Sequence, residues 1–232
     1  MDHILQHPAV PLLFVLASFA GFSALQKRFK NHAFFNPVIW SILSSVVLIK
    51  LSGISYQSYM EGAFPIHFLL GPATVALAVP LYRLLKNIKL DAKAIFVAIG
   101  FSSVFSAFSA MGVLIAMSAS KDLQLAITSK SVTAPIAIEI AQKLGTPESL
   151  AILFVFATNI PWLLFTGLAF KVFRIHDERA QGLALGTTCH GLGAARAFQI
   201  SEVAGTYSVI GMSLMGIISG LLLPILMIIL FK

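Results

Sequence analysis

The chain has 232 residues, of which 58% are hydrophobic and only 11% are charged, and its mean hydropathy is +0.91. Soluble domains are about a quarter charged, so this composition excludes an ordinary soluble domain and predicts an all-α polytopic membrane protein. The formal net charge of +7 is spread through short connections between apolar runs, which excludes a nucleic-acid-binding surface and fits cytoplasmic loops. We expect residues 1–232 to form one transmembrane domain with about six transmembrane helices.

The first two apolar runs are typical of ordinary membrane crossings. We expect one helix from Pro8 to Leu25 and a second from Asn36 to Leu51. Asn36 is expected to cap the second helix, with Pro37 at its first position, where proline is tolerated. Basic residues follow the first run and not the N-terminus, so the N-terminus is expected outside the cell. These basic residues are Lys27, Arg28 and Lys30.

The third run is expected to form a helix from Phe64 to Leu85, broken at Gly71-Pro72 and at Pro80 because proline removes a backbone donor. A dense basic connection follows it and is expected in the cytoplasm, which places a loop from Tyr56 to Glu61 outside. A fourth helix, from Ala94 to Met117, then completes the N-terminal helices, residues 1–120. The basic connection contains Arg83, Lys86, Lys89 and Lys93.

Two segments of residues 121–232 are too polar for ordinary crossings, and they run from Leu123 to Leu144 and from Gln181 to Ile200. Each is either a kinked crossing with a polar middle or a re-entrant hairpin. The hairpin is favoured because it keeps the basic cluster around Lys171 inside the cell. Its first two arms, Asp122 to Lys130 and Thr133 to Lys143, would each span roughly 14–17 Å, about half of a 30 Å hydrocarbon core.

An internal repeat supports the hairpins. The block from Leu123 to Phe170 aligns with the block from Gln181 to Ile228 at an offset of about 58 residues, which places Pro135 opposite Gly193. Each block would contain one hairpin and one long helix, and the blocks would open on opposite sides of the membrane. Such inverted repeats with broken helices are typical of secondary transporters.

The first hairpin carries a lysine, two hydroxyls, a proline and a carboxylate in an apolar stretch, and this pattern predicts an anion site. The residues are Lys130, Ser131, Thr133, Pro135 and Glu139. Thr133 is expected to cap a half-helix whose first turn accepts Pro135. The free N–H groups of such a helix start would lie near the middle of the membrane, where they bind anions. Glu139 is a candidate coupling or cavity-lining group.

The second hairpin is expected to complete the site with Gly191 and Gly193, which would let the backbone approach a ligand, and with Arg196. The planar guanidinium of Arg196 suits a carboxylate, and we give this residue the most weight. The alternative is that Arg196 forms an internal ion pair with Glu139 or Glu202. Glu202 is otherwise a further coupling candidate.

Four more residues are secondary candidates. His190 would relay protons or donate to a substrate hydroxyl, or it would serve only as a packing residue. Asn36, Thr74 and Asn159 lie beside helix breakers or inside helices, and they would line the cavity or join helices. Because the sequence has no cluster of metal ligands, no Gly-x-Ser-x-Gly elbow and no phosphate loop, we expect no metal, no cofactor and no enzyme activity.

Three stretches resemble the LrgB/CidB family of bacterial membrane proteins: GPATVALAVPLY at Gly71 to Tyr82, KSVTAPIAIEIA at Lys130 to Ala141, and HGLGAARAFQISEVAG at His190 to Gly205. The resemblance covers essentially the whole chain. It implies a protein of the bacterial inner membrane, often encoded beside a small LrgA/CidA-type partner. The family is described as holin/antiholin-like regulators of murein hydrolase export and cell lysis, whereas related plastid proteins are glycolate/glycerate carriers and bacterial relatives are linked to pyruvate uptake.

The residues and the resemblance together favour a secondary carrier of small 2-hydroxy or 2-oxo monocarboxylates, acting as a homo-oligomer in the lipid bilayer. A lysis regulator needs little internal chemistry, whereas this chain places glycine, proline and charged residues at two matched positions. The holin/antiholin-like regulator remains the alternative.

Overall fold

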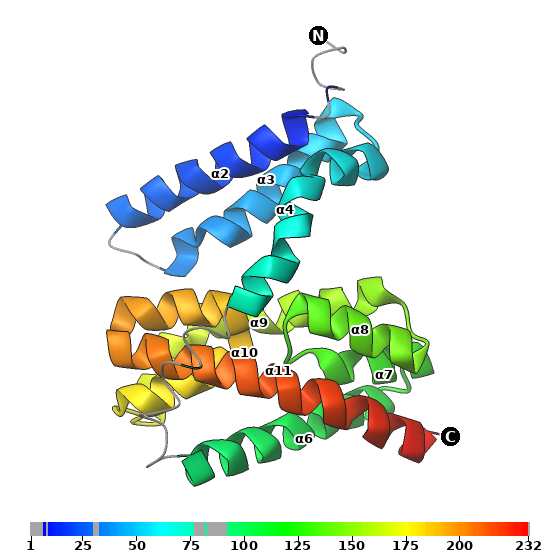
Figure 1. Ribbon diagram of the computed structural model, residues 1–232, viewed down its shortest axis with the longest axis vertical. Coiled ribbons are helices and arrows are strands. Elements are labelled where there is room, and N and C mark those ends of the chain that lie inside the picture. Colours follow the sequence, from blue (N-terminus) through cyan, green and yellow to red (C-terminus); the bar gives the residue numbers. More distant parts are fainter. Residues whose placement is uncertain (1–6, 8, 30–32, 77–81, 83–91, 232) are drawn as a thin grey trace. The chain divides into compact units, whose positions relative to one another are not determined.

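The computed structural model describes residues 7, 9–29, 33–76, 82 and 92–231, which form helices joined by short connections (Figure 1). The chain divides into two compact units, Met1–Ala76 and Leu77–Lys232. The boundary precedes the helix that starts at Ala92, so this helix packs with the C-terminal half of the chain. That residues 1–232 act as one transmembrane domain stays a prediction.

The first unit contains α2 (Ala9–Arg28), the short η1 (Ala33–Phe35), α3 (Pro37–Ser52) and α4 (Tyr56–Ala76), with α2 packed on both α3 and α4. Asn36 caps α3, because its side-chain oxygen accepts hydrogen bonds from the backbone nitrogens of Val38 (2.9 Å) and Ile39 (3.4 Å). The predicted cap and the predicted place of Pro37 are therefore confirmed.

The third predicted helix differs most from the structure. Because α4 begins at Tyr56, the predicted outer loop from Tyr56 to Glu61 is wrong, and these residues form the first turns of the helix. The predicted break at Gly71-Pro72 is also wrong, since α4 continues through it. A helix that continues through proline keeps its other backbone groups paired, which matters where water is absent. Pro80 and the basic residues Arg83, Lys86 and Lys89 lie outside the described residues.

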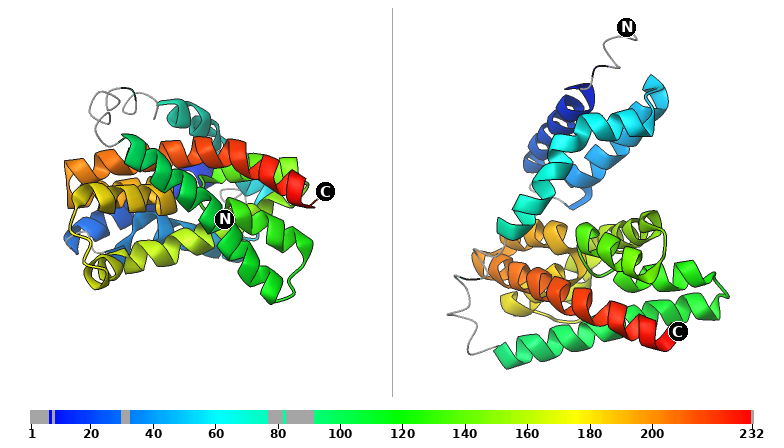
Figure 2. Two further views of the ribbon diagram at one scale, coloured as in Figure 1. Left: turned by 90° about the horizontal axis from the view of Figure 1, so that it is seen from below. Right: turned by 45° about the vertical axis from the view of Figure 1, so that its right-hand side comes forward.

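The second unit is arranged around its last helix (Figures 1 and 2). This helix, α11 (Glu202–Phe231), packs against α10 (Glu178–Ile200), α6 (Ala92–Ala116) and α8 (Ala134–Leu144). The apolar core includes Val132, Ile140, Val155 and Leu223, all of which are at most 2% exposed. The elements are α6 (Ala92–Ala116), α7 (Lys121–Ala126), η2 (Ile127–Ser129), α8 (Ala134–Leu144), α9 (Glu148–Val172), α10 (Glu178–Ile200) and α11 (Glu202–Phe231).

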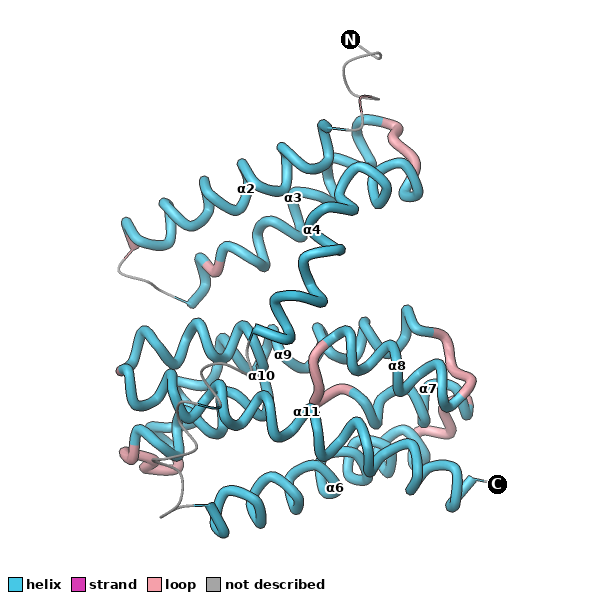
Figure 3. The backbone as a smooth tube through the Cα atoms, viewed as in Figure 1, coloured by secondary structure: helices cyan, strands magenta, loops and turns pink. Residues whose placement is uncertain are grey.

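The first hairpin, residues 121–144, consists of α7 with η2, a turn, and α8. Figure 3 shows the turn as a loop between two helical arms. Lys121 at the start of α7 and Leu144 at the end of α8 line the same pocket, so the second arm returns to the side where the first arm began. This reversal agrees with the predicted hairpin and disagrees with a kinked crossing of the same residues.

The second hairpin, residues 178–200, lies within α10 and reverses at His190, whose backbone (φ 48°, ψ −122°) is not helical. A Cβ on Gly193 would overlap with the carbonyl oxygen of Leu185. In a straight helix these residues would be separated by about 12 Å, so the second arm must fold back on the first. Asp177 caps the first arm, and a hydrogen bond from the side chain of Arg179 lowers the pKa of this carboxyl to about 2.

The reversals do not occur at the residues predicted from the repeat. At the offset of about 58 residues His190 lies opposite Val132, which belongs to the turn of the first hairpin. Pro135 lies instead in the first turn of α8, where its missing N–H needs no partner. Gly193 lies in the second arm of its hairpin. Pro135 and Gly193 therefore lie beside the reversals, and their prediction as matched breakers is wrong.

Within the described residues, four helices are long and apolar enough to cross a membrane: α2, α6, α9 and α11. The apolar α3 is shorter, with 16 residues. Large hydrophobic side chains on these helices are exposed, for example Phe101 (69%) and Leu221 (67%), as expected of surfaces that face lipid. The protein is thus an α-helical membrane protein, whereas the predicted count of about six crossings stays a prediction.

Candidate functional site

The turns of the two hairpins meet inside the second unit. The His190 ring of the second turn lies against the main chain of Ser131 and within electrostatic range of Lys130, both in the first turn. Asn159 of α9 lies beside them, with its Nδ2 3.3 Å from Nδ1 of His190. Ser131 and His190 are 6% and 3% exposed, so the meeting point is interior.

Lys130 is held by hydroxyl groups only. Its Nζ donates to Oγ of Ser106 on α6 (2.7 Å) and to Oγ of Ser131 (3.2 Å), and these two hydroxyls are themselves 2.7 Å apart. Among the described residues, Lys130 forms no ion pair. A lysine in the middle of a membrane helix costs about 2.5–3.5 kcal/mol on insertion scales, so such residues usually have a partner or a function. A half-buried cation without a carboxylate is therefore suited to an anionic ligand.

Two further polar atoms at the turns have hydrogen-bonding capacity to spare. Oγ1 of Thr133 and Nε2 of His190 are buried and, in the described part of the chain, have no hydrogen-bond partner. Thr133 occupies the N-cap position of α8, as predicted, but its hydroxyl makes no capping bond, so the predicted side-chain cap is wrong. Buried polar groups without partners are rare and are commonly satisfied by a bound molecule or water.

The amide of Asn159 is better satisfied with its oxygen and nitrogen exchanged. Its nitrogen then donates to the main-chain oxygens of Thr188 and Val155, the latter at 3.2 Å. Its oxygen then faces Nδ1 of His190, which becomes the donor and leaves Nε2 as an acceptor. Asn159 also accepts a hydrogen bond at its main-chain oxygen from the thiol of Cys189 (3.4 Å). Asn159 thus orients the ring and anchors the second turn.

The glycines of the second hairpin have different roles. Gly191 is exposed, and a Cβ added to it would meet nothing within 4 Å, so the backbone beside His190 is accessible. Gly193 is buried against Leu185, so it permits the close approach of the two arms. The predicted ligand roles of Gly191 and Gly193 stay predictions.

Arg196 lies in the second arm of the second hairpin. Its Nη1 donates to Oε1 of Gln199, further along the second arm. Glu139 and Glu202 are exposed. The role of Arg196 in binding a carboxylate, and the alternative of an internal ion pair with Glu139 or Glu202, both stay predictions.

The two remaining sequence-predicted residues belong to the first unit. The Asn36 side chain is used in capping α3. Thr74 lies in α4, but its side chain is outside the described part of the structure. All the residues that we place in the site therefore come from the second unit, and cavity-lining roles for Asn36 and Thr74 stay predictions.

Ser106 is the site residue that the sequence analysis missed. It lies on α6 among serines spaced about one turn apart in an otherwise apolar helix. Such hydroxyls commonly form hydrogen bonds between membrane helices, and this spacing was the available signal. Ser103, one turn earlier, bonds to Ser219 of α11 at 2.8 Å with both residues at most 1% exposed, so the same helix face joins α6 to the core.

Small residues hold the second hairpin in place. A Cβ on Gly182 would overlap with the main chain of Ala204, and a Cβ on Gly186 would overlap with that of Ser208, so α10 and α11 touch through their backbones. Two small residues four positions apart on each helix are typical of close membrane-helix packing. This contact fixes the position of the first arm and hence of His190 at its end.

The fold and site define a class of protein: a helical membrane protein in which two hairpins, from two separate segments, meet at a cation inside the molecule. The family model of the LrgB-like family matches residues 15–229, and the chain belongs to this family.

Relatives match over nearly their whole length. The holin-like protein CidB of Staphylococcus aureus (strain Mu50 / ATCC 700699) is 30% identical, with 99% of each chain covered. The holin-like protein CidB of Staphylococcus epidermidis (strain ATCC 12228 / FDA PCI 1200) is 28% identical over 100% of each chain. The uncharacterized protein YxaC of Bacillus subtilis (strain 168) is 30% identical over 95% of this chain and 97% of YxaC. No solved structure matches the chain.

Proposed function

We propose that the protein is a secondary carrier of small 2-hydroxy or 2-oxo monocarboxylates, of the glycolate, glycerate, lactate or pyruvate type. One observation carries this proposal: Lys130, where the two hairpin turns meet, is bonded to hydroxyls alone and forms no ion pair in the described part of the protein. A carboxylate would supply the missing negative charge.

The neighbouring groups fit the rest of such a substrate. Oγ of Ser106 and Oγ of Ser131 lie next to the ammonium and would donate to carboxylate oxygens. Oγ1 of Thr133 and Nε2 of His190 lack partners within the described residues. The Thr133 hydroxyl would donate to a hydroxyl or keto oxygen on the second carbon, and Nε2 of His190 would accept from a hydroxyl there. Exposed Gly191 beside His190 marks a point of access. The substrate would thus be recognised at both its functional groups.

The proposed membrane arrangement follows from the hairpins. Each would enter the bacterial inner membrane from one side and return to it, with the two blocks inverted and the N-terminus outside. A site between two opposed half-membrane hairpins can be reached from either side after a small movement, which is the geometry of alternating access. A homo-oligomer and a small LrgA/CidA-type partner belong to the same proposal.

The second candidate function is a holin/antiholin-like regulator of murein hydrolase export and cell lysis. The names of the staphylococcal relatives, both holin-like proteins, favour this candidate over the carrier. The interior cation favours the carrier, because a membrane lesion needs assembly of many copies but no built anion site.

Flux measurements with the purified chain in liposomes separate the two candidates. A carrier should take up radiolabelled glycolate or pyruvate in a saturable way and retain an entrapped fluorescent dye of larger size. A holin-like protein should release the dye and show no saturation. The measurement is repeated with the small partner added, because leakage that needs the partner would also support the regulator. Dye release without saturable uptake under either condition would overturn the carrier.

A further inference from the structure

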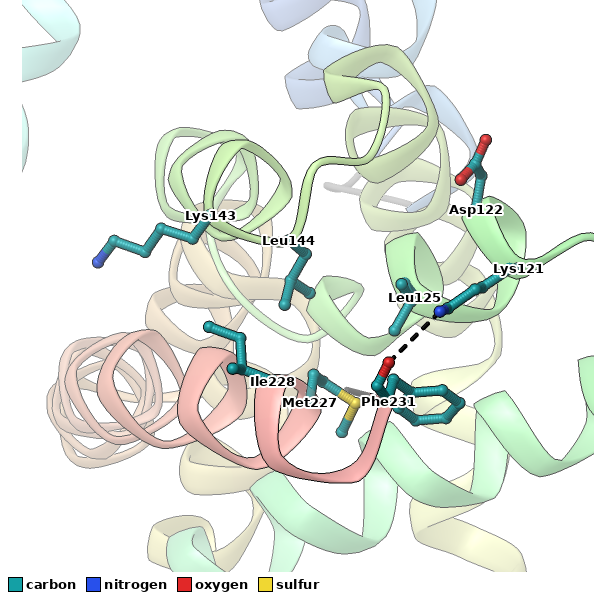
Figure 4. A pocket seen from close by; sticks show the side chains of 8 residues that line it. All are labelled: Lys121, Asp122, Leu125, Lys143, Leu144, Met227, Ile228 and Phe231. Atoms are coloured by element: carbon teal, nitrogen blue, oxygen red, sulfur yellow. Dashed lines mark hydrogen bonds between the residues drawn. The ribbon is translucent and has the colours of Figure 1, made fainter.

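A pocket of about 360 Å³ lies at the open end of the first hairpin, away from the turn that carries Lys130 (Figure 4). Three elements contribute to it: the start of α7, the end of α8 and the end of α11. It is lined by Lys121, Asp122, Leu125, Lys143, Leu144, Met227, Ile228 and Phe231. We propose that this pocket binds an anionic phospholipid, with the acyl chain against its apolar wall and the phosphate at its lysines.

The apolar wall continues onto the surface that faces lipid. Met227 at the floor is 1% exposed, whereas the next residue, Ile228, lines the pocket and is 48% exposed. Ile225 and Ile229 on the same end of α11 are 57% and 69% exposed. An acyl chain can therefore pass from the bilayer into the pocket without crossing a polar surface. A free phosphate ion would gain nothing from this wall, which is why we assign the pocket to a lipid.

The polar rim carries more positive than negative charge. Lys121 reaches over the pocket to the main-chain oxygen of Phe231, and its bond of 3.4 Å is longer than an ordinary hydrogen bond (Figure 4). Lys143 borders the pocket with its stem and extends its ammonium outward, and Asp122 also points away. Long lysine side chains commonly place their charge at the level of the lipid headgroups while their stems cover apolar surface. The phosphate would replace the weak Phe231 contact of Lys121 and attract Lys143.

The expected strength of lipid binding follows from the charges of the two lysines. Each lysine near a membrane surface contributes about 1 kcal/mol to binding of anionic lipid, or about fivefold. Replacing both Lys121 and Lys143 by Gln should therefore weaken phosphatidylglycerol binding by roughly 20- to 30-fold. Asp122→Asn should strengthen it, because the one negative group of the rim is removed. These effects do not depend on the carrier function.

Native mass spectrometry of the purified protein tests the proposal by comparing retention of phosphatidylglycerol and phosphatidylcholine with identical acyl chains. We expect preferential retention of phosphatidylglycerol, its loss in the double Gln variant, and its recovery when both lysines are Arg. Lys171→Gln, an exposed lysine at the end of α9, is the matched control. Equal retention of both lipids, an equal loss in the control, or displacement of the lipid by inorganic phosphate would each overturn the assignment. Thermal unfolding without lipid shows that the variants remain folded.

Discussion

Nζ of Lys130 donates a 2.7 Å hydrogen bond to Oγ of Ser106, although the two residues belong to different elements and are 24 positions apart. This bond attaches the turn of the first hairpin to α6. Because Ser131 bonds to the same hydroxyl, the turn is attached at two adjacent residues. The second hairpin approaches from the other segment and brings His190 to the same place.

The charge of Lys130 should matter for binding and not for folding. Lys130→Met should lower substrate affinity by roughly 10- to 150-fold, because a charge-assisted contact of about 1.5–3 kcal/mol is lost. Its thermal unfolding temperature should stay the same or rise, since a charge without a carboxylate partner is removed from the interior. Uptake and thermal unfolding are measured on the same preparation, with Lys171→Met as control. Unimpaired uptake by Lys130→Met would show that the substrate site lies elsewhere.

Ser106 should contribute to the site through its hydroxyl. Ser106→Ala removes an acceptor for Lys130 and a proposed donor to the substrate, so we expect an apparent affinity about fivefold weaker, as for one hydrogen bond of about 1 kcal/mol. Ser109→Ala is the matched control, because Ser109 lies one turn further on α6 and, among the described residues, its side chain bonds to the main-chain oxygen of Ser106 and not to Lys130. Equal effects of the two substitutions on the concentration dependence of uptake would contradict this role.

Two substitutions of His190 should separate the strain of its backbone from the role of its ring in transport. Its φ of 48° is a left-handed value that favours glycine, and such conformations cost on the order of 1–3 kcal/mol for other residues. His190→Gly should therefore be more stable than His190→Ala by about 1 kcal/mol, while both lose most of the substrate affinity. Chemical denaturation and uptake are compared for the two variants. Equal stability of the Gly and Ala variants would show that the backbone at His190 is not strained. Full uptake by either variant would show that the His190 ring is not part of the site.

Gly186 should tolerate no side chain. A Cβ there would overlap with the main chain of Ser208, so Gly186→Ala should destabilise the protein by about 1–3 kcal/mol through overpacking. Gly167→Ala in α9 should instead stabilise it by about 0.5–1 kcal/mol, because a Cβ would meet nothing within 4 Å and alanine favours helix. The midpoints of unfolding by heat or denaturant distinguish the two. A similar decrease of the unfolding midpoint in both variants would argue against backbone contact between α10 and α11.

The membrane arrangement of the first hairpin is tested by cysteine labelling. In a Cys189→Ser background, cysteines at Asp122 and at Glu148 should react with a membrane-impermeant reagent from the same side, because a hairpin and not a crossing separates them. Both positions are exposed, so we expect a cysteine at each to be accessible to the reagent. If the two cysteines react from opposite sides, the hairpin is not re-entrant.

Several features were determined by the sequence alone, because they depend on local chemistry. The apolar composition predicted the membrane class, and Asn36-Pro37 predicted the start of α3 within one residue. The first hairpin was also predictable, since two short helical patterns flank the polar stretch around Lys130. The start of α4 was not, because the weakly polar residues after Tyr56 read as a loop but join the helix, where their backbone groups are paired.

Only the tertiary structure decided which polar residues meet. Ser106 looks like any serine of an apolar helix until the first hairpin brings Lys130 to it. The close packing of the two arms of α10 at Gly193 and the hydrogen bond from Arg196 to Gln199 likewise appear only in the folded chain. The sequence specifies the chemistry that each residue can perform. Whether it performs that chemistry depends on which distant residue lies within hydrogen-bonding distance, and that is set by the packing of one hairpin against α6 and the other against α11.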